Sequence, residues 1–136
     1  MKELLLDANV LVRFLVQDDP QQSPAATALF ERAERREFLL HLDSLTVAEV
    51  LYVLVGRYRR SRIDVASALL TIIHNTGVET ADAGLVTDAL QRFAATDVDF
   101  ADAWLAARAA QVGHAVASFD RDLDKFKDIR RFEPKG

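Results

Sequence analysis

Five acidic side chains stand where a run of apolar residues ends or where a helix is expected to begin. Asp7 follows the apolar run 4–6, and Glu49 lies about one turn into the helix expected after the run 38–42. Asp99 and Asp102 open the helix expected before the run 115–117, and Asp120 follows that run. In an open parallel sheet, ligands bind beyond the carboxyl ends of the strands. The pattern therefore predicts that separate segments bring these acids to one edge of a sheet.

Carboxylates gathered at one edge need a cation, because ionised neighbours of like charge raise each other's pKa. A hard divalent ion such as Mg²⁺ or Mn²⁺ prefers oxygen ligands. The reaction that combines such a site with a phosphate is metal-assisted phosphodiester hydrolysis. The acids thus favour a metal-dependent phosphodiesterase.

Each acid also has a simpler structural role open to it. Asp7 fits a helix N-cap, while Asp99 and Asp102 suit the first turn of a helix because of the helix dipole. The spacing from Thr46 to Glu49 is that of a capping box, and Asp120 suits a turn. No single acid indicates a metal site by itself. The metal site is favoured because the acids are expected to lie at the same edge of the sheet.

The elements that must position these acids alternate between strands and helices. Strands are expected over residues 4–6, 38–42, 78–80, 115–120 and 129–132, the last at an edge. Helices are expected behind Asp7 to residue 15, from Ser23 with Pro24 at the first helical position, and over 44–58, 63–75, 83–95 and 100–112. The first two strands lack alternation, which is typical of strands buried on both faces. This order predicts a single three-layer α/β domain over residues 1–136, with a central, mainly parallel sheet flanked by helices.

The helix expected over residues 44–58 is apolar nearly all round, which favours deep burial or a subunit interface. Its end is basic, with Arg57, Arg59, Arg60 and Arg62 within six residues. Such a cluster is either a solvated helix end or a contact surface for phosphate.

Composition excludes several classes of protein. The chain has 136 residues and no cysteine, so disulfide scaffolds, thiol nucleophiles and zinc–thiolate sites are ruled out. The net charge of −4 argues against a broad cationic surface for duplex DNA. No apolar run is long enough to span a bilayer. The apolar run near the N-terminus is too short for a secretory signal, and the segment around it is too acidic. A cytoplasmic protein is expected.

Other catalytic motifs are missing from the sequence. The segment Asp120–Asp124 starts like a calcium loop, but Lys125 stands where glycine is required. The three histidines are far apart, no serine lies in a Gly-x-Ser-x-Gly motif, and no glycine-rich phosphate loop is present. Structural roles are expected for the histidines.

Four segments resemble the motifs of PIN domains, in the order of that family. They are Leu5-Leu6-Asp7-Ala8-Asn9-Val10, Thr46-Val47-Ala48-Glu49-Val50, Asp99-Phe100-Ala101-Asp102-Ala103-Trp104 and Ser118-Phe119-Asp120-Arg121-Asp122-Leu123. Each is modest alone, but together they are specific and extend over nearly the whole chain. The length, without added domains, resembles the VapC toxins of toxin–antitoxin pairs.

The resemblance implies a Mg²⁺- or Mn²⁺-dependent endoribonuclease in which Asp7, Glu49, Asp102 and Asp120 bind the metal. Asp99 matches a frequent extra acid, Asn9 and Ser118 match polar residues that steady the site, and Asp122 is either a lesser ligand or a surface residue. A homodimer and a small VapB-like antitoxin that blocks the site are also implied.

Two other functions remain open at this stage. One is a PIN-type nuclease that processes ribosomal or structured RNA as housekeeping, and the other is a PIN-like binding module without catalysis. The presence of all four acids favours an enzyme. Because the sequence offers no histidine pair for attack by the RNA 2′-hydroxyl, the chemistry favours hydrolysis that leaves a 5′-phosphate.

Overall fold

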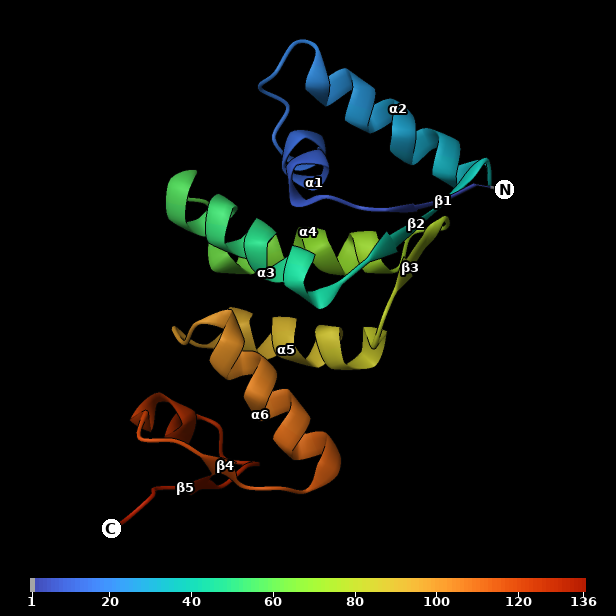
Figure 1. Cartoon of the computed structure of the whole chain (residues 1–136). Helices are drawn as coiled ribbons and strands as arrows, with labels where there is room; N and C mark the ends of the chain where they lie inside the picture. Colours follow the sequence, from blue (N-terminus) through green and yellow to red (C-terminus); the bar gives the residue numbers. More distant parts are fainter. Residues whose placement is uncertain (1) are drawn as a thin grey trace. The chain divides into compact units, whose positions relative to one another are not determined.

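Three parallel strands form the sheet of the N-terminal part of the chain in a computed structural model, which describes residues 2–136 (Figure 1). The strands are β1 (Lys2–Leu5), β2 (Phe38–Leu42) and β3 (Val78–Thr80), in the order β1-β2-β3. Leu4 pairs with Leu40, and Leu40 pairs with Val78. Leu40 and Leu42 are fully buried in the central strand, as expected for an apolar run without alternation.

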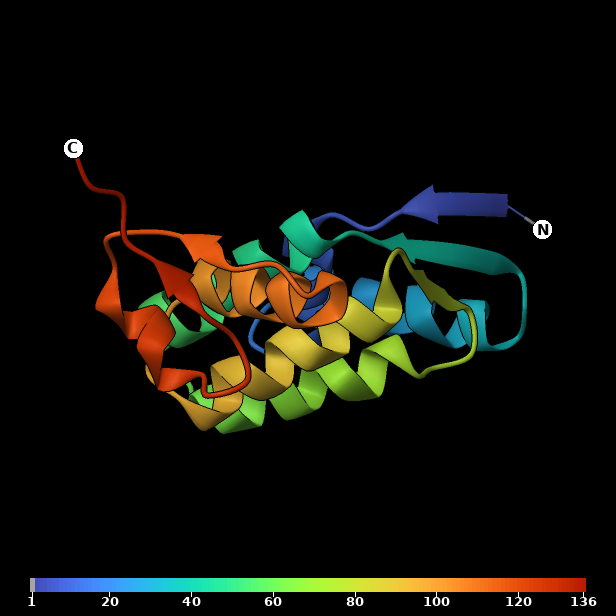
Figure 2. The same cartoon turned by 90° about the horizontal axis from the view of Figure 1, so that it is seen from below.

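The helices around this sheet are α1 (Ala8–Leu15), α2 (Gln22–Glu34), α3 (Ser44–Leu51) and α4 (Arg62–Ile73), with a π-helix, η1 (Tyr52–Arg57), continuing α3. The rings of Phe14 and Phe30 stack with centroids 4.1 Å apart and join α1 to α2. Figures 1 and 2 show β1 and β2 side by side, each leading into a helix.

The remaining elements are α5 (Ala83–Ala95), α6 (Phe100–Val112), β4 (Val116–Ala117), the 3₁₀ helix η2 (Arg121–Lys125) and β5 (Arg131–Phe132). Strands β4 and β5 pair in parallel as a separate two-stranded sheet. The Phe93 and Phe100 rings meet edge to face between α5 and α6, with centroids 6.3 Å apart. Gly113 ends α6 in the left-handed conformation, with φ of 74°.

The chain thus has a mixed α/β fold with parallel strands, which confirms the predicted fold class. It divides into two compact units, Met1–Ala83 and Gly84–Gly136. No helix within residues 2–136 is long and apolar enough to cross a bilayer.

Two strands of the C-terminal unit are shorter than predicted. The strand expected over residues 115–120 spans Val116–Ala117, because Ser118 and Asp120 already cap the turn into η2, and the strand expected over 129–132 spans Arg131–Phe132.

Two predictions in the N-terminal unit are also wrong. The first strand spans Lys2–Leu5 and lies at the edge of its sheet, and it is not buried on both faces, since Leu5 is 79% exposed. Helix α2 begins at Gln22, so Pro24 is its third residue rather than its first. The Asp19 carboxylate starts the helix earlier by accepting hydrogen bonds from the Gln21 and Gln22 amides at 2.9 and 2.7 Å. Proline is tolerated there because the first turn has no intrahelical acceptors for its amides.

The predicted helix over residues 44–58 is present, but it buries only one side. Val47 and Val50 are fully buried, whereas Leu45 and Tyr52 are 82% and 70% exposed. Leu45, Glu49 and Tyr52 follow one another at steps of four and three positions, so they lie on the same exposed face.

Gly77 lies against the backbone of Ala33. It has a φ of 87°, and a Cβ at this position would clash with the carbonyl group of Ala33. The turn before β3 therefore requires glycine both for its conformation and for the space it leaves.

We expect Gly77→Ala to lower the free energy of unfolding by about 2 kcal/mol or more, since left-handed strain and a backbone clash add. Gly56→Ala is the control, because Gly56 is helical and a Cβ added there would meet nothing within 4 Å. That change should be neutral or stabilising by about 0.5–1 kcal/mol. Urea unfolding measures both, and equal effects would contradict the assigned role of Gly77.

Candidate metal centre

Three aspartates of the C-terminal unit form a compact acidic cluster. Asp102, Asp120 and Asp122 each offer a carboxylate oxygen, and these oxygens all lie within 4.8 Å of one another. Asp102 and Asp122 are half-buried, and Asp120 is exposed. We call these three residues the acidic cluster.

Helix α6 positions Asp102 in its first turn. Asp99 is the N-cap of this helix, and its Oδ1 accepts a hydrogen bond from the Asp102 amide at 2.9 Å. Phe100 and Ala103 are buried, and the Phe100 ring contacts that of Phe93 in α5. The acid therefore stands at the positive end of the helix dipole, which favours a carboxylate.

The end of β4 and the start of η2 position the other two acids. The Ser118 hydroxyl accepts a hydrogen bond from the Asp120 amide at 2.9 Å, and Asp120 Oδ1 accepts one from the Asp122 amide at 2.9 Å. Leu123 is 1% exposed and anchors η2 in the interior. Asp120 uses one carboxylate oxygen in this cap, which leaves its other oxygen available to a ligand.

Burial and neighbouring negative charges disfavour the ionised form of one acid in the acidic cluster. Burial, followed by the neighbouring negative charges of Asp99 and Asp120, raises the pKa of Asp102 to about 6. Lys125 offsets part of the negative charge, since its Nζ lies 3.2 Å from Asp122 and also pairs with Asp97. The donor set is all oxygen and anionic, which fits a hard divalent cation.

Two of the predicted metal ligands belong to the N-terminal unit. Asp7 caps α1, with Oδ2 accepting from the Asn9 amide at 3.2 Å, and it follows Leu6, whose amide bonds to the His41 carbonyl of β2. Glu49 is exposed on α3, whose first turn is tied to Leu6 by the Thr46 hydroxyl at 3.4 Å. The complete set of four acids stays a prediction.

The structure refines the roles that the sequence motifs indicate for two residues, Asp122 and Asn9. Asp122, which the motifs leave open as a lesser ligand or a surface residue, lies in the acidic cluster. In the sequence, the feature that could have indicated this is its position two residues after Asp120, which is the N-cap of the same short helix. The contact of Asn9 with Asp7 is made by its backbone amide, which any residue except proline could supply.

The basic segment lies at the end of η1. Arg57, Arg59 and Arg60 are exposed, and Arg59 has a positive φ of 54°. Arg62 is the first residue of α4, after the N-cap Ser61. Arg57 is therefore the last residue of η1, and Arg59 and Arg60 lie in the connection between η1 and α4.

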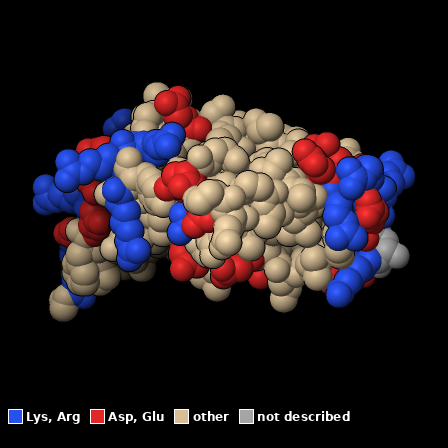
Figure 3. All heavy atoms as spheres, turned by 90° about the horizontal axis from the view of Figure 1, so that it is seen from above, with Lys and Arg blue, Asp and Glu red and all other residues tan. Residues whose placement is uncertain are grey.

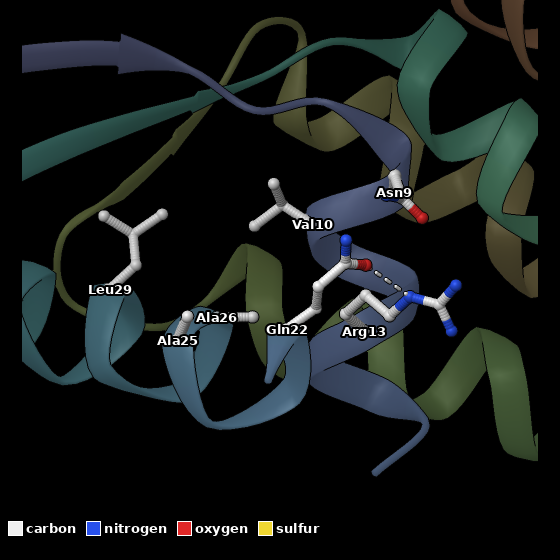
Figure 4. Close-up of a pocket in the computed structure, with 7 residues that line it drawn as sticks. All are labelled: Asn9, Val10, Arg13, Gln22, Ala25, Ala26 and Leu29. Atoms are coloured by element: carbon white, nitrogen blue, oxygen red, sulfur yellow. Dashed lines mark hydrogen bonds between the residues drawn. The ribbon is translucent and has the colours of Figure 1, made fainter. Parts of the chain in front are cut away.

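A pocket of about 290 Å³ lies between α1 and α2 (Figure 4). Its apolar wall consists of Val10, Ala25, Ala26 and Leu29. At its polar end, the Arg13 Nε donates to Gln22 Oε1 at 3.0 Å, as Figure 4 shows, and Arg13 also pairs with Asp18. The pocket therefore suits an apolar group, since its one cation is already paired.

The acidic cluster lies on an α/β fold with parallel strands and offers only carboxylate oxygens to a ligand. The chain matches the PIN domain family over residues 4–129, and it belongs to that family. PIN domains are generally nucleases, and they usually use a divalent metal. A comparison with curated proteins found no match.

The raised pKa of Asp102 predicts a pH-dependent cost to stability. Because its folded pKa lies above the value of about 3.9 for an unfolded chain, the folded state binds more protons between these values, and stability falls as the pH rises through this window. We expect Asp102→Asn in the metal-free protein to raise stability at pH 7.5, by on the order of 1–2 kcal/mol after allowance for solvent screening. At pH 4 the difference should vanish.

Asp64→Asn is a matched control for this prediction. Asp64 also occupies the third position of a helix, and its amide bonds to the N-cap Ser61 at 3.1 Å, but it is exposed. This change should lower stability slightly at pH 7.5 through the helix dipole. Thermal unfolding in a chelator measures both, and a destabilised Asp102→Asn at pH 7.5 would contradict the prediction.

Proposed function

We propose that this chain is a metal-dependent endoribonuclease and the toxin of a VapBC-type toxin–antitoxin pair. The observation that carries the proposal is the acidic cluster, in which three carboxylates are held together by caps and buried side chains. The choice of RNA and of the toxin role rests on the resemblance of the four acidic motifs.

Asp102, Asp120 and Asp122 would hold Mg²⁺ or Mn²⁺, together with Asp7 and Glu49. A bound divalent ion supplies an activated water and offsets the charge that develops on the phosphate. Asp99 and Ser118 act on the backbone: they fix the amides of Asp102 and Asp120 and so orient the two carboxylates.

The histidines do not offer an alternative acid–base pair. His41 lies in the sheet and its Nε2 is 2.7 Å from Glu3 Oε1, while His74 is the C-cap of α4 in the same unit. The contact of His41 with Glu3 fits the structural role expected for that histidine.

The exposed arginines at the end of η1 are proposed to contact RNA phosphates. Arg57, Arg59 and Arg60 lie within four residues and are exposed to solvent. On the face drawn in Figure 3, acidic and basic side chains lie next to one another, so this face is not a broad cationic surface. Contact with the phosphates of RNA is therefore proposed for this local group of arginines.

A cognate VapB-like antitoxin and a homodimer complete the proposal. An arginine or lysine of the antitoxin would pair with the acidic cluster, and an apolar antitoxin helix would fill the pocket between α1 and α2. The exposed Leu45 and Tyr52 on α3 and η1 support a dimer surface. Sedimentation at micromolar concentration tests the dimer. Titration of the neighbouring gene's product at several Mg²⁺ concentrations tests the antitoxin, whose inhibition should weaken as Mg²⁺ rises.

We expect Asp120→Asn and Asp7→Asn each to lower Mg²⁺-dependent RNA cleavage by at least about 100-fold, because each removes an anionic ligand while nearly keeping its shape. Asp82→Asn is the control: Asp82 is exposed with a φ of 53°, a conformation that asparagine tolerates equally well. Cleavage of mixed RNA is measured alongside thermal unfolding. Full activity in a folded Asp120→Asn protein would refute the proposed site.

We expect Arg59→Gln to weaken RNA binding and to reduce the salt dependence of the affinity, by roughly 0.7 in the log–log slope for one lost phosphate contact. Arg36→Gln is the control, because Arg36 is also exposed and also has a positive φ, of 64°. Both changes remove one charge at a left-handed position. Equal slopes for the two variants would place the phosphate contacts elsewhere.

A further inference from the structure

Arg131 makes a dense set of polar contacts in the C-terminal unit. Its Nε and Nη2 donate to the two oxygens of Asp124 at 3.0 and 3.2 Å, which is a bidentate pair. Its Nη1 donates to the Ser118 carbonyl at 3.1 Å and to Glu133 Oε1 at 3.0 Å. The Arg131 side chain is only 13% exposed, whereas its partners Asp124 and Glu133 are exposed to solvent.

The two principal partners of Arg131 enclose the segment that carries two members of the acidic cluster. Ser118 follows β4, and Asp124 lies in η2, while Asp120 and Asp122 lie between them. One planar guanidinium therefore joins both ends of the segment 118–124. The pairing of β4 with β5 places Arg131 opposite Val116 and so brings it to this segment.

We infer that Arg131 is a positioning residue for metal binding, which holds Asp120 and Asp122 in the geometry of the acidic cluster by clamping the segment 118–124. The inference rests on the proposed function, since it concerns the same metal. The guanidinium touches the backbone at Ser118 and the side chain at Asp124, and it acts on the cluster through them. Lysine does not reproduce these contacts, because its ammonium lacks the rigid planar fork that binds both oxygens of Asp124 side by side while another nitrogen reaches the Ser118 carbonyl.

The sign of the effect separates positioning from simple charge. Arg131 is a cation beside an anionic site, so by Coulomb's law its removal should tighten the binding of a divalent cation. A residue that positions the ligands has the opposite effect, because its loss allows the segment 118–124 to move. Residues that orient metal ligands typically change metal affinity by roughly 10–100-fold.

The test is the affinity of the full chain for Mn²⁺, measured from the electron paramagnetic resonance signal of free Mn²⁺ below the unfolding temperature of each variant. Arg131→Gln should bind Mn²⁺ about 10-fold or more weakly than the unaltered chain. Arg131→Lys keeps the charge but not the fork, and it should also bind more weakly. Arg130→Gln is the matched control, because the neighbouring Arg130 is exposed; its affinity should be unchanged or slightly tighter.

Unchanged or tighter Mn²⁺ binding by Arg131→Gln and Arg131→Lys would overturn the inference, even if both variants unfold at a lower temperature. If Arg131→Gln does not fold, Arg131→Lys and Asp124→Asn carry the test, and combining these two changes should add little to either one alone. Failure of the unaltered chain to bind Mn²⁺ would overturn the proposed metal site itself, and with it the inference.

Discussion

Repulsion between carboxylates is the constraint on which the functional region depends. Asp102, Asp120 and Asp122 lie close enough for one ion to bridge them, and like charges at that separation oppose one another. The raised pKa of Asp102 is the direct expression of partial burial together with this repulsion. Such a cluster lowers the free energy of unfolding of the metal-free chain, and residues with shifted pKa values are common at functional sites.

The surrounding chain holds the acidic cluster together by backbone capping and by two cations, one that pairs with a member of the cluster and one that pairs with a neighbouring acid. Asp99 and Ser118 bond to the amides of Asp102 and Asp120, while Arg131 and Lys125 pair with Asp124 and Asp122. These contacts restrain η2 through its polar groups, and Leu123 restrains it through the interior. The same short helix is therefore fixed on both sides, which keeps its carboxylates in place without a partner on every oxygen.

Much of the fold follows from local sequence signals, and so does part of the candidate site. The bounds of β2, β3, α5 and α6 match those predicted, because apolar runs, alanine-rich helices and Gly113 determine them locally. The π-helix over Tyr52–Arg57 has no such signal, because its apolar residues are equally compatible with an α-helix. Asp102 and Asp120 stand at a helix start and a strand end, which sequence patterns reveal, and the structure brings these two together. Arg131 reaches Ser118 only through the pairing of β4 with β5, and long-range pairing leaves no local signal.

The central claim is that this PIN domain hydrolyses RNA through a metal held by the acidic cluster. The most direct measurement is mass spectrometry of the ends produced when the purified chain cleaves RNA in Mg²⁺, with a chelator-treated sample beside it. The proposed mechanism predicts 5′-phosphate and 3′-hydroxyl ends that form only with the metal. Ends with a 2′,3′-cyclic phosphate, or cleavage that persists in the chelator, would contradict it.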